Sequence, residues 1–248
     1  MLNNYTIAKD WSEVTVEQFI ELKTLSNNGL LSNYIEQFCI LANIDQADEL
    51  FDNVDTDELI NEISKLHFLN HLPTKVTNTI NEYKLININK ITIGEFIDID
   101  TYMSDNFYTN IPKIAAILYR KHKVDEWGNE IIEPYDFDLN ERSLIFEEIT
   151  INDIYGALER FKAFKTNVMN IYKSLFNDDS DDEDLSEDES KGLDDEEIKR
   201  INADIQKEKL RKRFAWSALV YNLSNEDICK MNDVYNLPLI FCLNILIM

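Results

Sequence analysis

Apolar residues recur with a helical period of three to four positions along most of the chain. The first such stretch follows Thr15, which has capping-box spacing with Gln18, and it predicts a helix over residues 16–26. Two further stretches predict helices over residues 30–42 and 55–72. Three short amphipathic helices are therefore expected at the start of the chain.

The pattern changes after residue 80. Apolar residues alternate with polar ones over residues 83–93, which predicts a strand. Thr92 and Glu95 again have capping-box spacing and predict a helix that continues past Tyr102. Pro112 is expected in the first turn of the next helix, where its missing N–H does little harm.

Residues 123–138 interrupt the helical pattern. The sequence Trp127-Gly128-Asn129 is a turn signal between short apolar arms, and it predicts a loop or a small hairpin. A long helix of about 26 residues is expected to begin near Thr150, with one apolar face along its length.

An abrupt change of composition divides the chain. Residues 178–197 hold 13 acidic residues and a single Lys, about half of the formal net charge of −23, with few apolar side chains to bury. We therefore expect a helical N-terminal domain over residues 1–177, an acidic linker over 178–197 and a small helical C-terminal domain over 198–248. With only 5 Gly and 4 Pro for tight turns, the expected fold is mainly α with at most a small β-hairpin.

The net charge limits the function classes. A protein at −23 repels phosphate backbones, so direct binding of nucleic acid is not expected. An acidic DNA mimic would need its charges fixed on a folded surface, whereas half of them are gathered here in one run. The apolar segment over residues 237–248 spans twelve residues, short of the roughly 20 that cross a bilayer, so no membrane span is expected.

Motifs for catalysis or cofactor binding are lacking in the sequence. It has no glycine-rich phosphate loop and no GxSxG, and its three cysteines are far apart. His67 and His71 have the i, i+4 spacing of a zinc-binding helix, but Phe68 stands where a metalloprotease needs Glu. The acidic run has no glycine at the sixth position of a calcium-loop pattern. No enzyme activity, cofactor or metal is predicted.

Basic residues cluster over residues 207–213, in the middle of a stretch with helical period. The cluster can dock on an acidic partner or fold back against residues 178–197 of the same chain. The second alternative is favoured, because opposite charges on one chain are at high effective concentration.

The end of the chain is apolar on nearly every side of a predicted helix. Such a helix must be covered by its own domain, by a second copy or by another protein. Burial in its own small domain, self-association and binding of a partner all stay open. The candidate partner-binding residues are Phe214, Trp216, Leu237, Leu239, Ile240, Phe241, Leu243, Ile245, Leu246 and Ile247.

Several stretches resemble the tail assembly chaperones of tailed bacteriophages. The likeness covers roughly residues 10–176 and 214–243. It is carried by Trp11-Ser12-Glu13-Val14-Thr15-Val16-Glu17-Gln18-Phe19, Tyr34-Ile35-Glu36-Gln37, Cys39-Ile40-Leu41, Leu66-His67-Phe68-Leu69, Thr92-Ile93-Gly94-Glu95-Phe96-Ile97-Asp98, Ala116-Ile117-Leu118-Tyr119-Arg120, Phe214-Ala215-Trp216 and Leu237-Pro238-Leu239.

The resemblance implies a non-enzymatic morphogenesis protein that shields the phage tape-measure protein, or another virion protein, while the tail assembles. It also implies a place in the host bacterial cytoplasm, or in the virion if the protein stays with the particle. The alternative is a virion structural or packaged cargo protein of a tailed phage. The concentrated acidic run departs from the family, whose pattern does not require it.

Overall fold

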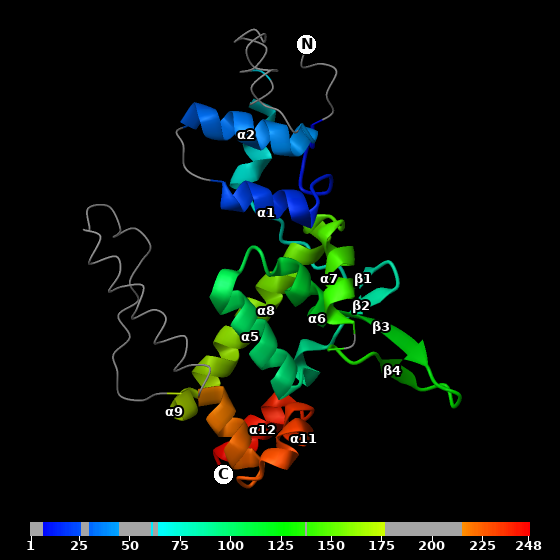
Figure 1. The fold of residues 1–248 in the computed structure, drawn as a ribbon, viewed down its shortest axis with the longest axis vertical. Coiled ribbons are helices and arrows are strands. Elements are labelled where there is room, and N and C mark those ends of the chain that lie inside the picture. The colour runs from blue at the N-terminus through cyan, green and yellow to red at the C-terminus, as the bar shows by residue number, and fades with distance from the viewer. Residues whose placement is uncertain (1–6, 26–29, 45–60, 62–63, 137, 177–214) are drawn as a thin grey trace, which may run out of the picture. The chain divides into compact units, whose positions relative to one another are not determined.

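The computed structural model describes residues 7–25, 30–44, 61, 64–136, 138–176 and 215–248 (Figure 1). These residues form a mainly helical protein with one small four-stranded antiparallel sheet, so the predicted fold class is confirmed. None of the described helices combines the length and the apolar character needed to cross a membrane. The acidic run, the basic cluster and Phe214 lie outside the described residues.

The chain divides into two compact units whose boundaries differ from the predicted domains. Unit 1 contains the described residues up to Ile86 and those from Asn106 to Ala163. Unit 2 contains Asn87–Asp105 and the described residues from Phe164 onward. The C-terminal segments therefore share their unit with residues from the middle of the chain.

Unit 1 consists of helices and the sheet. Its elements are α1 (Val16–Thr24), α2 (Leu30–Ala42), η2 (Lys65–Asn70), β1 (Thr79–Ile80), β2 (Tyr83–Leu85), α6 (Ile111–Leu118), β3 (Tyr119–Val124), β4 (Glu130–Ile132), α7 (Leu139–Glu147) and the first part of α8 (Ile151–Ile171). The strands follow one another in the order β1-β2-β3-β4, each antiparallel to its neighbour. Every residue of α6 except Lys113 is buried, and α6 packs along α7.

Capping and aromatic packing fix the N-terminal part of unit 1. Thr15 and Gln18 form the predicted capping box of α1. The Phe19 ring lies 5.4 Å from the ring of Trp11 and 5.7 Å from that of Tyr155, centroid to centroid, and both pairs meet edge to face. These rings join α1 to α8, because such contacts stabilise aromatic pairs beyond the area they bury.

Gly156 in α8 shows how closely two segments of unit 1 approach. A Cβ atom at this position would lie 2.0 Å from the backbone oxygen of Lys75. Only glycine leaves room for the extended chain to cross the helix there.

Among the described residues, the regular elements of unit 2 are all helices. They are η3 (Ile88–Lys90), α5 (Ile93–Asn106, whose last residue belongs to unit 1), the end of α8, α9 (Lys173–Phe176), a helix over residues 215–223, η5 (Ile228–Lys230), α11 (Met231–Tyr235) and α12 (Leu239–Leu246). The ring of Phe96 lies at its centre, 5.2 Å from that of Trp216 and 6.3 Å from that of Phe164. Aromatic side chains from three segments thus form much of this core.

Two predicted elements differ from the structure. The strand expected over residues 83–93 is limited to β2, because Ile88 starts the 3₁₀-helix η3 and Ile93 starts α5. The alternating isoleucines are buried all the same. The part of the predicted helix 55–72 that the structure describes ends as the 3₁₀-helix η2, and residues 55–60 lie outside the described residues.

Candidate protein-binding surfaces

The start of α12 is fixed by backbone hydrogen bonds in unit 2. The N–H of Leu239 donates to the carbonyl of Ile91 at 2.9 Å, and the N–H of Ile93 donates to the carbonyl of Leu237 at 2.9 Å. The hydroxyl of Tyr172 donates to the side-chain oxygen of Asn244 at 2.9 Å. The helix therefore has one defined orientation, and its two faces have different surroundings.

One face of α12 belongs to the core. Leu239, Cys242 and Leu243 have no exposed surface. Trp216 is only 4% exposed, with its ring against Phe96. Trp216, Leu239 and Leu243 were predicted to bind a partner, and the structure corrects this because they pack inside their own unit.

The other face of α12 exposes apolar side chains. We call Leu237, Phe241, Ile245 and Ile247 the C-terminal surface, and Phe241 is 53% exposed. Phe241 and Ile245 are spaced i, i+4 on α12, whereas Leu237 precedes the helix and Ile247 follows its last residue. Ile240 and Leu246, also predicted partner-binding residues, are half-buried at its edges. Residues 234–248 include no charged side chain, in a chain where 29% of residues are charged.

A second exposed apolar feature lies on unit 1. Strands β3 and β4 form the hairpin predicted around Trp127, and they extend away from α6 and α7 (Figure 1). We call residues 119–132 the hairpin arm. Trp127 is 83% exposed, Val124 70%, Ile131 50% and Ile132 41%.

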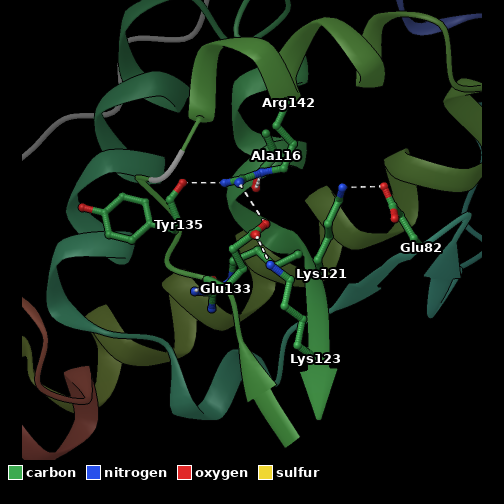
Figure 2. A network of polar contacts seen from close by, with 8 residues as sticks. Glu82, Ala116, Lys121, Lys123, Glu133, Tyr135 and Arg142 are labelled. Carbon is green, nitrogen blue, oxygen red and sulfur yellow. Dashed lines mark hydrogen bonds and ion pairs between the residues drawn. The ribbon is translucent and has the colours of Figure 1, made fainter. Parts of the chain in front are cut away.

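The base of the hairpin arm is held by Arg142, a buried side chain on α7 (Figure 2). Its Nε donates to the carbonyl of Ala116 at 3.0 Å, and its Nη2 donates to the carbonyl of Tyr135. Its Nη1 lies 4.0 Å from a carboxylate oxygen of Glu133, at the end of β4. One guanidinium thus joins α6, α7 and the strand end.

Further ion pairs line the two strands of the arm. Glu133 also pairs with Lys123 at 3.2 Å, and Lys121 pairs with Glu82 at 2.6 Å (Figure 2). Burial lowers the pKa of Arg142, while the neighbouring carboxylate of Glu133 opposes that shift. A guanidinium stays charged under these conditions, so the contact remains an ion pair.

The turn of the arm, residues 125–129, is closed by the carboxylate of Asp125. One of its oxygens accepts the backbone N–H groups of Trp127 at 2.9 Å and Asn129 at 2.7 Å, and the other accepts the side-chain amide of Asn129 at 2.9 Å. Gly128 adopts φ +84°, a conformation that glycine reaches without strain. The turn therefore holds Trp127 in a defined position while its ring stays in solvent.

An open cavity of about 440 Å³ lies among α1, α2 and η2 of unit 1. Both apolar and polar side chains line it, so its lining does not identify a ligand class. The lining residues are Trp11, Leu22, Lys23, Tyr34, Gln37, Ser64, Leu66, His67, Leu69 and Asn70.

Two of the cysteines, Cys39 and Cys242, are buried. Burial raises the pKa of the Cys39 thiol to about 11, and it also raises that of Cys242, which keeps both protonated at neutral pH. No three His, Cys, Asp or Glu residues within the described ranges gather as metal ligands. His67 lies in η2, whereas His71 follows it in an extended conformation, so the two do not share a helical face.

Helix α5 carries the acidic residues Glu95, Asp98 and Asp100 close together in sequence. Glu95 is buried, and its carboxylate accepts the backbone N–H of Thr92 at 2.8 Å as half of the predicted capping box. Asp100 pairs with Lys165. Both carboxylates serve the structure of unit 2.

Comparisons with protein-family models, with curated proteins and with solved structures found no match to this chain.

Proposed function

We propose that this protein is a non-enzymatic assembly factor, a tail assembly chaperone that shields the tape-measure protein of a tailed phage. The observation that carries the proposal is the C-terminal surface. It is an uncharged, apolar helix face whose position is fixed by a packed core on the other side. Exposed apolar side chains grouped around one helix are typical of a surface that another protein covers.

Shielding follows from two properties of the chain. When a client covers the exposed parts of Phe241 and Ile245, each Å² of apolar area removed from water contributes about 25 cal/mol of favourable binding free energy. The net charge of −23 gives the complex like-charge repulsion from its copies, which opposes aggregation. Apolar contact would thus hold the client, and charge would keep the complex in solution.

The first test is co-expression with the tape-measure protein of the phage that encodes this chain. We expect the pair to purify together and the double variant Phe241→Asp, Ile245→Asp to lose at least tenfold in affinity, because it places charges where apolar contact is needed. Ile228→Asp is the matched control, since Ile228 is 73% exposed in unit 2 but lies outside α12. Equal losses in both variants, or no complex with the wild type, would overturn the proposal.

Mass spectrometry of purified virions separates the proposal from its alternative. Absence of the chain from mature particles supports a chaperone, and presence at a fixed copy number supports a virion component. Light scattering of the isolated chain tests self-association through the same surface. A dimer that the Phe241→Asp, Ile245→Asp variant dissociates would assign the C-terminal surface to a second copy.

A further inference from the structure

The hairpin arm has features of a docking element that the proposed function does not use. Its base is fixed by a buried arginine and its turn by three hydrogen bonds to one carboxylate. Prior ordering matters, because a partner does not have to immobilise the segment when it binds. The most exposed large apolar residue of this ordered segment is Trp127.

Tryptophan, with tyrosine and arginine, is enriched among the residues that contribute most of the binding energy in protein interfaces. The other two tryptophans of the chain, Trp11 and Trp216, are 7% and 4% exposed and pack against phenylalanine rings of their own units. Trp127 differs from them in being 83% exposed at the end of a projecting hairpin. The ring of Trp127 therefore contributes little to the core of unit 1 or to the packing of its sheet.

The charge around Trp127 points to the kind of partner. Asp125 and Glu126 precede it, and the turn 125–129 contains no Lys or Arg. The lysines of β3, Lys121 and Lys123, are paired with Glu82 and Glu133. A second copy of this chain brings a further net charge of −23, and an anionic lipid surface also repels the turn. A basic surface is the complementary one.

We infer that the hairpin arm binds the client by inserting Trp127 into an apolar pocket that has Lys or Arg side chains at its rim. The client is the tape-measure protein, so this inference rests on the proposed function. The arm thereby gives the client a second contact, on unit 1, in addition to the C-terminal surface on unit 2. The C-terminal surface offers apolar contact without charge, whereas the turn of the arm combines one aromatic anchor with the acidic neighbours Asp125 and Glu126.

The test uses the full chain labelled with 5-fluorotryptophan, which gives one ¹⁹F signal for each of Trp11, Trp127 and Trp216, with Trp127→Phe to assign the exposed one. On titration with unlabelled tape-measure protein, we expect the Trp127 signal to shift or broaden far more than the two buried references. Trp127→Ala should weaken binding roughly 30-fold. Leu72→Ala, at a residue that is 41% exposed in the same unit, should change it little.

Charge reversal tests the basic rim. Glu126→Lys should weaken binding by about fivefold at low salt and reduce its salt dependence, whereas Glu21→Lys, on an exposed position of α1, should not. If the Trp127 signal stays unchanged in a complex that forms, the inference is overturned and the proposed function stands. If the wild-type chains form no complex, both fail.

Other occupants give distinct results with the same label. A Trp127 shift that grows with the concentration of the chain alone, together with a dimer mass, would replace the client by a second copy. A shift on adding phosphatidylcholine vesicles would replace it by a lipid surface. Either result overturns the inference.

Discussion

The C-terminal surface and the hairpin arm both expose apolar side chains, but the protein supports them in different ways. Helix α12 is held by apolar burial at Leu239 and Leu243 and carries no charge. The arm is held at its base by Arg142 and Glu133 and at its turn by Asp125. The difference teaches that exposed apolar side chains can be positioned either by a core or by a polar network.

The strongest test of this contrast removes the buried guanidinium of unit 1. Arg142→Met keeps much of the volume but leaves the carbonyls of Ala116 and Tyr135 without this donor and leaves Glu133 with Lys123 as its remaining ion-pair partner. We expect a loss of about 4 kcal/mol in the free energy of unfolding, the usual effect of breaking a buried ion pair. Urea denaturation followed by circular dichroism measures it.

Arg160→Met on α8 is the control for that experiment, because Arg160 is exposed in the same unit. This substitution should lower the free energy of unfolding by less than about 0.5 kcal/mol. A similar effect of both substitutions would show that the Arg142 network does not stabilise the fold.

The second test compares the two faces of α12. Leu243→Ala removes a fully buried side chain. It should lower the free energy of unfolding by about 3 kcal/mol, because apolar burial is lost and a cavity is left behind. Phe241→Ala removes a larger side chain that is 53% exposed, and it should cost less than about 1 kcal/mol. Thermal unfolding of the two variants gives the comparison, and a reversed order would mean that the exposed face is part of the core.

These contrasts also explain what the sequence could predict. The capping boxes of Thr15 with Gln18 and of Thr92 with Glu95 are local patterns, and both form as expected. The turn at Trp127 was also predicted, since Gly128 and its neighbours determine it locally. The exposure of Trp127 was not predicted, because turn chemistry does not indicate whether other segments cover the ring.

Helix α7 shows why one element gave no signal. Its buried positions are Arg142, Ser143 and Phe146, while Leu144 and Ile145 are 60% and 42% exposed. Periodicity detects a helix by an apolar face that points inward, and here that pattern is nearly reversed. The Arg142 network was therefore missed together with the helix that carries it.

The candidate surface on α12 was predicted only in part for a related reason. A segment that is apolar on all sides does not reveal which side its own unit covers. The backbone contact of Leu239 with Ile91 decides this, and it joins residues far apart in the chain. Long-range contacts of this kind assign Leu243 to the core and Phe241 to the surface.

A smaller effect is expected at the turn of the arm. Gly128→Ala forces a side chain into φ +84°, although the added Cβ meets no atom within 4 Å. The cost is backbone strain alone, about 1 kcal/mol, so the turn should open roughly fivefold more often. Hydrogen exchange of the Asp125 amide, which donates to the carbonyl of Asn129 at 2.9 Å, reports this opening. Gly128→Asn should have a weaker effect, because asparagine tolerates positive φ better.

The smallest expected effect is a pH dependence confined to this turn. The side-chain amide of Asn129, together with backbone N–H groups, lowers the pKa of Asp125 below its ordinary value. A carboxylate with a lowered pKa stabilises the folded turn above its ordinary pKa of about 4, and this contribution is lost as the pH falls through the lower folded value. The turn should thus keep its structure from neutral pH down to about pH 4 and loosen in stronger acid. The amide shift of Trp127, whose N–H donates to Asp125, should follow that titration. In Asp125→Asn the same shift should be flat between about pH 2 and 5, and a wild-type midpoint above the ordinary value would contradict the role of the carboxylate.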